Sequence, residues 1–422
     1  MTSTTPVTGC PYAIDGAGTD IHAEADALRA LGPAAPALLP GNIRAWSVTD
    51  PALIRRLLVH PDISKDASQH WPAYIDGEVP ADWPLRIWVD VRNALSAYGT
   101  EHRRLRRALS TAFTSRRVRA LVPRIEEITQ GLLDELEDAG PDETVDLRAR
   151  FAWRLPLLVV NAVLGVPDDL HDAFRDTIGR LFSTGSTPEE AVAAATDVYG
   201  LIGRLIEYKR EHPEKDVTTS LVRAQAAGEI TTQELADSMM LLIGAGHETT
   251  VNLLDHATVL LLTHPDQLAL VTSGKTPWDQ VVEEALRLEA PLATMIMRFA
   301  VNDLTDEASG VTFAKGDALV VNFAAAGRDP GAHGSDADRF DVTRETARDH
   351  LAFGHGVHFC LGFELARAEA RIALSALFAR FPDLSLAVDP GELKPLASFI
   401  SNGHQSIPVR LGRTVRPEPT TA

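Results

Sequence analysis

Cys360 stands in a short, glycine-rich segment, Phe353-Gly354-His355-Gly356-Val357-His358-Phe359-Cys360-Leu361-Gly362. Glycine allows sharp turns and a close approach of the backbone to a flat ligand, so this segment is suited to deliver one sulfur to a binding site. A helix is expected from about Leu361 to Arg380, and the N–H groups and partial positive charge at its start stabilise a thiolate. The segment predicts a thiolate that serves as a ligand or reactive group; the alternative is a buried structural cysteine.

A second unusual stretch, Ala245-Gly246-His247-Glu248-Thr249-Thr250, lies inside a long apolar run. Glycine costs about 1 kcal/mol relative to alanine in a helix interior. Threonine hydroxyls compete for the backbone carbonyls of the preceding turn. Taken alone, the stretch predicts a local distortion of a helix, and the plain interpretation is a kink that serves packing.

Charged residues recur at spacings that place them on one helix face. Glu284 and Arg287 are three residues apart, which alone indicates an ordinary surface ion pair. His102 and Arg106 lie one turn apart and share a face. Residues 101–124 hold eight arginines and one glutamate in a chain whose formal net charge is −18. This basic stretch is either a solvated face or a docking surface.

The element that carries the second stretch has the strongest helix signal in the chain. Thr231-Thr232-Gln233-Glu234 has the spacing of a capping box, with Ile230 and Leu235 placed as a hydrophobic staple. Apolar residues continue to Leu262, before His264-Pro265 ends the run. At 1.5 Å per residue this is roughly 50 Å of helix, long enough to cross a domain. Because most of its faces are apolar, it should be central and buried.

The remaining pattern predicts a mainly α protein with a smaller β portion. A strand followed by a helix is expected over residues 42–60, and irregular structure over 64–99. Further helices are expected at 101–114, 116–139, 151–164, 168–183 and 188–211, and short strands at 297–301, 311–313 and 318–322. We expect residues 1–422 to form a single catalytic domain in which residues 1–20 and 413–422 are loose ends.

Composition limits the class of protein. With only two cysteines, Cys10 and Cys360, a disulfide framework or a cysteine-rich metal cluster is excluded. The acidic balance argues against nonspecific nucleic-acid binding. No apolar run approaches the ~18 residues of a membrane span, and the start lacks the regions of a signal peptide. We expect a cytoplasmic enzyme that is a monomer and has no membrane or nucleic-acid partner.

The cysteine segment resembles the haem-binding loop of the cytochrome P-450 family, Phe-x-x-Gly-x-x-x-Cys-x-Gly, at every fixed position. The resemblance implies the fold of that family, with haem b between the long helix and the cysteine loop. It implies that the Cys360 thiolate ligates the haem iron and favours O–O cleavage. Phe353 is implied to pack near the sulfur, with Gly354 and Gly362 as cofactor-binding positions.

The mid-helix stretch resembles the oxygen-activation motif of the same family, Ala/Gly-Gly-x-Asp/Glu-Thr, with Ala245 at its first position. By this resemblance Gly246 leaves room for O2 over the haem, Thr249 donates a hydrogen bond during oxygen activation, and Glu248 relays protons into a dry pocket. His247 is expected to point away from the iron and to have no catalytic role.

The charged residues match further positions of the family. Glu284 and Arg287 match its Glu-x-x-Arg motif, and Arg339 is expected to complete that buried structural network. The two haem propionates require Arg and His donors, and the matched positions are His102, Arg106, Arg298 and His358.

The resemblance also implies electron-transfer partners, a ferredoxin and a ferredoxin reductase that draws on NAD(P)H. The basic residues 101–124 are expected to border the face where the acidic ferredoxin docks. Charge reversal at Arg103 or Arg104 should therefore slow turnover.

Two segments, Tyr98-Gly99-Thr100-Glu101 and Ser64-Lys65-Asp66, are similar to an actinobacterial branch whose members oxidise steroids and macrolactones. By analogy the pocket is lined by residues 71–95, 175–190, 241–249, 292–297 and 398–402. The apolar side chains among them are Trp88, Val89, Leu241, Leu292, Ala293, Met295, Met297, Phe399 and Ile400. No charged group is aimed at a substrate, so a neutral, bulky, apolar molecule is favoured.

These expectations converge on an O2-dependent monooxygenase that hydroxylates a steroid-like molecule. Four alternatives stay open: a macrolactone or polyketide hydroxylase, an H2O2-driven peroxygenase, an epoxidising or coupling enzyme, and a non-catalytic haem sensor or carrier. Glu248 and Thr249 argue against the peroxygenase, which would have no need of a proton relay.

Overall fold

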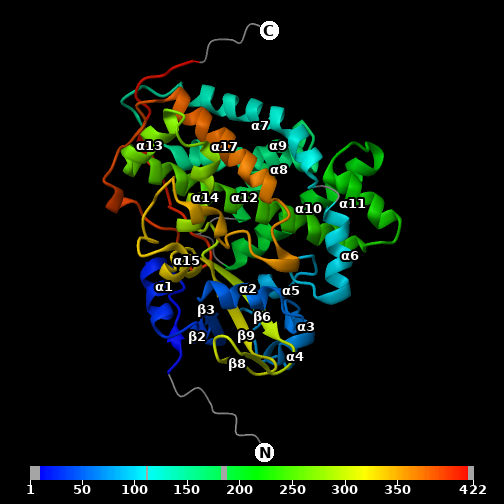
Figure 1. Ribbon diagram of the computed structural model, residues 1–422. Helices are drawn as coiled ribbons and strands as arrows, with labels where there is room; N and C mark the ends of the chain where they lie inside the picture. The colour runs from blue at the N-terminus through cyan, green and yellow to red at the C-terminus, as the bar shows by residue number, and fades with distance from the viewer. Residues whose placement is uncertain (1–9, 111–112, 182–187, 417–422) are drawn as a thin grey trace, which may run out of the picture.

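The computed structural model of the chain describes residues 10–110, 113–181 and 188–416, and helices dominate it (Figure 1). The first helices are α1 (Ile21–Ala30), α2 (Pro51–Val59), α3 (Ala67–His70), α4 (Pro72–Ile75), α5 (Ile87–Asp90), α6 (Gly99–Ser110) and α7 (Ser115–Leu136). The middle of the chain forms η1 (Arg148–Ala152), α8 (Arg154–Leu164), α9 (Asp168–Leu181), α10 (Pro188–Glu211), α11 (Val217–Ala226), α12 (Thr232–Thr263), α13 (Pro265–Thr272) and α14 (Trp278–Leu288). The last helices are α15 (Phe323–Gly327), α16 (Pro330–His333), η2 (Glu345–Asp349), η3 (Gly356–His358), α17 (Phe363–Arg380) and η4 (Pro390–Glu392).

The long helix α12 is the central element of the helical part, as its sequence predicts. The Thr231 hydroxyl accepts from the Glu234 amide and the Glu234 carboxylate accepts from the Thr231 amide, so the capping box is present. Helices α8, α10, α14 and α17 all contact α12, and α7 packs across α8 and α17 (Figure 1). One hydrophobic core, which includes Ile243 and Leu254 of α12, fills the space between these helices.

The β portion lies at the opposite end of the molecule in Figure 1 and holds a six-stranded sheet with the order β1-β2-β3-β9-β6-β4. Its strands are β1 (Tyr12–Ala13), β2 (Ala34–Leu39), β3 (Ile43–Val48), β4 (Ile63–Ser64), β6 (Thr294–Ala300) and β9 (Ala318–Asn322). Two smaller sheets are formed by β5 (Thr144–Asp146), β10 (Ser385–Leu386) and β11 (Pro408–Arg410), and by β7 (Leu304–Asp306) and β8 (Val311–Phe313). Within the large sheet β4 and β6 are antiparallel, with Ser64 opposite Phe299.

The sequence predicts the main elements closely. The strands at 311–313 and 318–322 are confirmed with the expected ends, and the long helix, the helix after Cys360 and the strand near 297 are confirmed with shifted ends. The region 64–99, expected to be irregular, holds the short helices α3, α4 and α5 between the end of β4 at Ser64 and the start of α6 at Gly99. Parts of the two ends that we expected to be loose form regular contacts. Residues 12–13 form a strand against β2, the Val415 amide donates to the Arg380 carbonyl at 2.8 Å, and the outermost residues of both ends lie outside the described residues.

None of the described helices combines the length and the apolar character that a bilayer crossing requires.

Candidate active site

Helix α12 continues unbroken through the Ala245–Thr250 stretch, so the expected kink does not interrupt the helix. The Thr249 hydroxyl donates to the Ala245 carbonyl at 2.7 Å, the back-bonding that threonine makes inside helices. Ala245 is exposed although it lies in the middle of the central helix, whereas Ile243 and His247 are fully buried. At Ala245 one side of α12 is therefore not covered by neighbouring side chains.

The two small residues of the stretch have different surroundings. A Cβ added to Gly246 would lie 3.2 Å from Cγ2 of Val160 in α8, so the missing side chain lets α12 and α8 pack closely. The role expected for Gly246, room for O2 over the haem, stays a prediction, and Ala245 is the exposed residue of the stretch. His247 points elsewhere, as expected: its Nε2 lies 3.0 Å from the Trp153 carbonyl.

Glu248 is half-buried beside the open face of α12. Burial raises the pKa of its carboxyl, while a hydrogen bond with Ser401 and the charge of Arg148 act in the opposite direction. A carboxyl whose pKa moves towards neutrality can hold and release a proton at working pH. The Ser401 contact was not foreseen, because it joins α12 to the C-terminal segment and no local spacing signals it.

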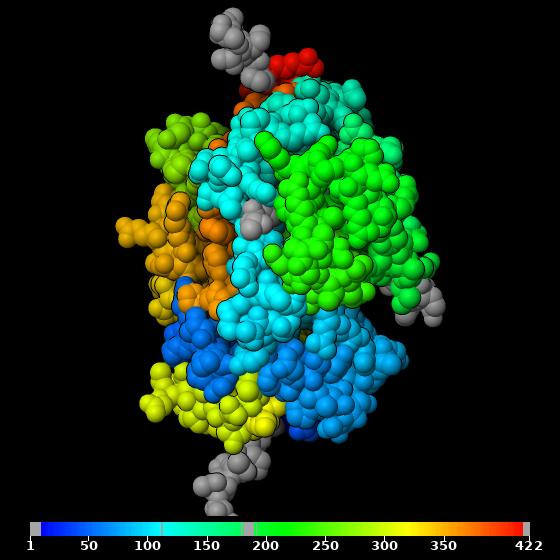
Figure 2. All heavy atoms as spheres, turned by 90° about the vertical axis from the view of Figure 1, so that its right-hand side faces the viewer, coloured from blue at the N-terminus to red at the C-terminus, as the bar shows by residue number. Residues whose placement is uncertain are grey.

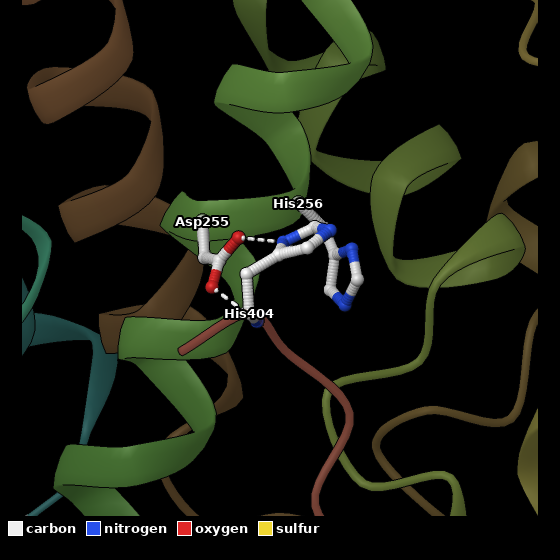
Figure 3. Close-up of side chains that lie close together, drawn as sticks. All are labelled: Asp255, His256 and His404. Atoms are coloured by element: carbon white, nitrogen blue, oxygen red, sulfur yellow. Dashed lines mark hydrogen bonds and ion pairs between the residues drawn. The ribbon is translucent and has the colours of Figure 1, made fainter. Parts of the chain in front are cut away.

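A buried network around Asp255 holds Arg148, and Figure 3 shows its members Asp255, His256 and His404. Asp255 accepts from Arg148 Nη1 at 2.5 Å and from the backbone amide of His404 at 2.8 Å, and its second oxygen lies 2.5 Å from Nδ1 of His404. Burial opposes the charge of His404, but the bond to Asp255 raises its pKa. Asp255, His256 and His404 have ligand-type atoms within 4.8 Å of one another. Because both Asp255 oxygens already have partners, one of them a cation, we interpret the cluster as an ion-pair network and not as a metal site.

The Cys360 loop is also partly accessible: Cys360 and most residues around it are only half-buried. The Cys360 amide donates to the Phe353 carbonyl at 2.9 Å, which closes the loop. Burial raises the pKa of the Cys360 thiol, and the Gly362 amide, Arg106 and Arg367 act to lower it. The helix-start amide therefore reaches the sulfur, as the sequence predicts.

Two glycines of this loop have positive φ, Gly354 at +73° and Gly356 at +71°. A Cβ on Gly356 would lie 2.6 Å from the Leu58 carbonyl oxygen, so only glycine fits there. A Cβ on Gly362 would meet nothing within 4 Å.

Phe353 lies in an aromatic cluster under the loop, with ring centroids 6.3 Å from Phe359 and 6.4 Å from Phe363. The Arg367 guanidinium lies over the Phe353 ring at 4.7 Å and also forms hydrogen bonds of 2.6 and 2.9 Å with both oxygens of Glu283. Neither Arg367 nor Glu283 was foreseen. Together they hold the loop rigid and place a cation near the sulfur.

The four basic residues expected to bind propionates come together from three parts of the chain. The His102 and His358 rings lie 4.1 Å apart, and Arg106 Nη2 donates to the Phe359 carbonyl at 2.5 Å. Burial, and then the nearby arginines, lower the pKa of His102 to about 4, and burial lowers that of Arg298 to about 10. Among the described residues, no partner bonds to His102 Nε2 or Arg298 Nε. Buried donors without acceptors fit a cofactor that carries carboxylates.

Glu284 and Arg287 form a fully buried ion pair with two bonds of 2.7 Å. The third member is Arg344, whose Nε lies 3.2 Å from Glu284. Arg339, expected in that place, is wrong: its side chain is exposed, and only its backbone carbonyl accepts from Arg287, at 3.0 Å. Four loop residues, 340–343, lie between the two arginines, and the loop path decides which one turns inward.

The expected pocket residues divide into two groups. Val89, Ala293, Met297, Phe399 and Ile400 are buried, whereas Trp88, Leu241, Leu292 and Met295 are half-buried and keep surface available for a ligand. The Ala293 amide donates to the Ile400 carbonyl at 2.8 Å, which joins two of the expected segments. Residues 182–187 of the segment 175–190 lie outside the described residues.

The basic stretch forms one face, and Figure 2 shows α6 and α7 (cyan) beside the orange segment that holds the Cys360 loop and α17. Arg103, Arg107 and Arg119 are exposed there. Arg104 is not available: it pairs with Glu234 at the start of α12 and with Glu101. The docking role expected for Arg104 is therefore transferred to its exposed neighbours, Arg103 and Arg107.

Comparisons with known proteins agree with this geometry. Residues 278–396 match the family model described as cytochrome P450. The chain is 41% identical to 2-hydroxy-5-methyl-1-naphthoate 7-hydroxylase of Streptomyces carzinostaticus over 95% of this chain and 98% of that protein. It is 39% identical to 6-deoxyerythronolide B hydroxylase of Saccharopolyspora erythraea, over 91% and 94%.

A solved structure of testosterone-bound CYP154C4 from a Streptomyces species matches with a TM-score of 0.91 and 39% identity, covering 97% of this chain and 100% of that chain. Identity at this level over nearly the whole length shows the family and not the fold alone. The chain therefore belongs to the cytochrome P450 family and is a haem-dependent monooxygenase.

Proposed function

We propose that the chain binds haem between α12 and the Cys360 loop and oxygenates a bulky, largely apolar molecule. The observation that carries this proposal is a pair of accessible surfaces on elements that pack together, α12 and the loop that leads into α17. One is the open face of α12 at Ala245, and the other is the half-buried loop of Cys360. Cys360 would bind the iron, and His102, Arg106, Arg298 and His358 would bind the propionates.

The haem, when bound through a thiolate, supplies the activation of O2. The residues of the chain supply position and protons. Thr249 presents a hydroxyl whose own proton is held by the Ala245 carbonyl, and burial raises the pKa of Glu248 beside it, which favours the protonated carboxyl. The Ser401 contact keeps Glu248 in place. This pair would deliver protons to a pocket that otherwise excludes water.

A steroid-like substrate is the first candidate. The half-buried side chains Trp88, Leu241, Leu292 and Met295 are apolar, and methionine adapts its shape to a large ligand. The similar structure that holds testosterone supports this choice.

A macrolactone is the second candidate, and the relative that hydroxylates 6-deoxyerythronolide B supports it. Hydroxylation in secondary metabolism covers both candidates.

Electrons would enter through an acidic ferredoxin that docks on the exposed arginines of α6 and α7. Charge reversal of Arg103 and Arg107 together should lower the rate of reduction by ferredoxin, more strongly at low salt. The matched control is Arg44→Glu in β3, an exposed arginine away from α6 and α7 (Figure 1). Equal loss in both variants would contradict docking on α6.

The test of substrate class is an optical titration of the ferric protein with progesterone and, separately, with a macrolactone. A low-to-high-spin shift identifies the class that enters the pocket.

The Thr249→Ala variant separates the mechanisms, because a monooxygenase should then consume NAD(P)H with little product while a peroxygenase keeps its H2O2-driven rate. A sensor or carrier gives no product in either case. In Cys360→Ser, a ferrous–CO spectrum that keeps the red-shifted thiolate band would refute the assignment of the iron ligand.

A further inference from the structure

Lys65 is a buried cation without an anionic partner. Its side chain is 3% exposed, and its Nζ donates to the Ile296 carbonyl at 3.0 Å and lies 3.8 Å from the Met295 sulfur. No Asp or Glu in the described part of the chain forms an ion pair with it. A buried ammonium that bonds only to neutral groups is costly unless a ligand supplies the negative charge.

The sheet register places Lys65 against a second buried cation. In the antiparallel pair β4–β6, Ile63 is opposite Ala300 and Ser64 is opposite Phe299, so the next position puts Lys65 opposite Arg298. Like charges directly opposite across strands are destabilising. Burial, followed by the charge of Arg298, lowers the pKa of Lys65 well below its usual range. Nothing in the fold alone accounts for two such cations side by side.

The same cations act on the residues expected at the propionates. Lys65 and Arg298 both lie close enough to His358 to disfavour its charged form, and Arg298 does the same to His102. Lys65, His102, Arg106, Arg298 and His358, which we name the cation cluster, form no ion pair with any carboxylate of the described residues. A cluster of basic side chains that no carboxylate of the described residues balances fits a dianionic ligand.

We propose that Lys65 is a further haem-binding residue, which donates to a propionate carboxylate together with Arg298. This inference rests on the proposed haem site and extends it by a residue that no motif indicates. A substrate carboxylate is the other source of the same chemistry, because Met295 lies beside Lys65. We favour the propionate because the cations that surround Lys65 are the expected propionate donors, whereas the half-buried pocket residues are apolar.

The test uses the purified ferric holoprotein and two readouts that do not depend on turnover. The first is the rate of haem transfer to excess apomyoglobin, and the second is the set of propionate bending modes in the resonance Raman spectrum. Lys65→Met should release haem about tenfold faster and shift one propionate mode, because one charged hydrogen bond to a carboxylate is lost. Lys65→Arg should stay within about twofold of the wild type. The control is Lys315→Met, an exposed lysine, which should change neither readout.

Lys65→Gln keeps a donor for the Ile296 carbonyl without the charge, and it replaces Lys65→Met if that variant yields too little holoprotein. Unchanged propionate modes in the neutral variant would overturn the proposal, even if haem loss were faster, since a purely structural lysine would also loosen the site. Loss of a 1-naphthoate-induced spin shift with unchanged haem release would overturn it as well, in favour of the substrate carboxylate. The ferrous–CO spectrum separates failure of the Lys65 proposal from failure of the proposed haem site. A preserved thiolate band means that the haem assignment stands even when the Lys65 variants contradict the role of Lys65.

Discussion

Two buried charged clusters of this protein are built in opposite ways. Around Glu284, every cation has an anion or carbonyl: Arg287 donates to both carboxylate oxygens and to the carbonyls of Gly327, Ala337 and Arg339, with distances of 2.6 to 3.0 Å. The cation cluster brings together five basic residues. Some of their own buried nitrogens, such as His102 Nε2 and Arg298 Nε, have no acceptor in the described structure.

The difference separates structure from function. A buried ion network whose bonds are all made needs nothing else and holds the loops before the Cys360 segment. A buried group of like charges is unstable by itself and persists because a ligand completes it. The variants below test this distinction, in order of expected effect.

Glu284→Gln should have the largest effect. It leaves Arg287 buried without a countercharge and leaves Arg344 with Asp336 as its one carboxylate partner, and breaking a buried pair from one side costs about 3–5 kcal/mol. We expect little folded holoprotein, measured as the yield of haem per protein and by thermal unfolding. Glu127→Gln is the control, since Glu127 pairs with Arg124 on the surface and such pairs contribute about 1 kcal/mol or less. If both variants lost the same stability, the Glu284 network would not be the structural centre that we describe.

Arg298→Met should weaken haem binding and yet relieve charge repulsion inside the protein. We expect haem transfer to apomyoglobin to accelerate at least tenfold, and the midpoint of thermal unfolding of the holoprotein to fall because the bound ligand no longer stabilises the fold as strongly. Arg119→Met, on the exposed basic face, should change neither quantity. Haem retention equal to that of the wild type would mean that the cation cluster does not serve the cofactor.

Glu369 in α17 is a third kind of buried ionisable group, a carboxyl without a cationic partner among the described residues. Its Oε2 has no bonding partner in the described structure, and burial raises the pKa of its carboxyl well above the usual range. A group with a raised native pKa contributes stability below its unfolded pKa, about 4.3 for Glu, and loses it as the pH rises towards the native value. Glu369→Gln should therefore match the wild type at pH 4 and exceed it at pH 8 by on the order of 1 kcal/mol.

The Glu369 prediction is measured by urea unfolding at both pH values, and Glu126→Gln, at an exposed position, is the control. A loss of stability in Glu369→Gln at pH 8 would show that the carboxylate has an anionic role that the contacts do not reveal.

The sequence predicts those parts of the site that depend on local pattern. The capping box at Thr231 and the glycine loop before Cys360 are contiguous, so their geometry follows from neighbouring residues. Lys65 and Arg344 could not be assigned in this way. Lys65 reaches the site through the register of β4 against β6, and Arg344 reaches Glu284 through the path of a loop. The close approach of Gly246 to Val160 could not be predicted either, because the rotation of α12 against α8 sets its direction, and sequence spacing does not contain that rotation.

His404→Asn should have the smallest effect, and its sign depends on pH. The bond to Asp255 raises the pKa of His404, so this pair stabilises the fold fully below about pH 6.5, the unfolded value for histidine, and loses that contribution as the pH rises through the native pKa. The variant should be less stable than the wild type by about 1 kcal/mol at pH 6. The gap should narrow at high pH, because Arg148 still balances Asp255 at 2.5 Å.

Urea unfolding across this pH range measures the gap, with His212→Asn at an exposed helix end as the control. A gap that did not change with pH would mean that His404 acts by packing and not by charge. If the gap does narrow, the Asp255 network belongs with the Glu284 network: Arg148 keeps a partner in either protonation state, so its charge stays fixed behind Glu248 while the proton on Glu248 moves.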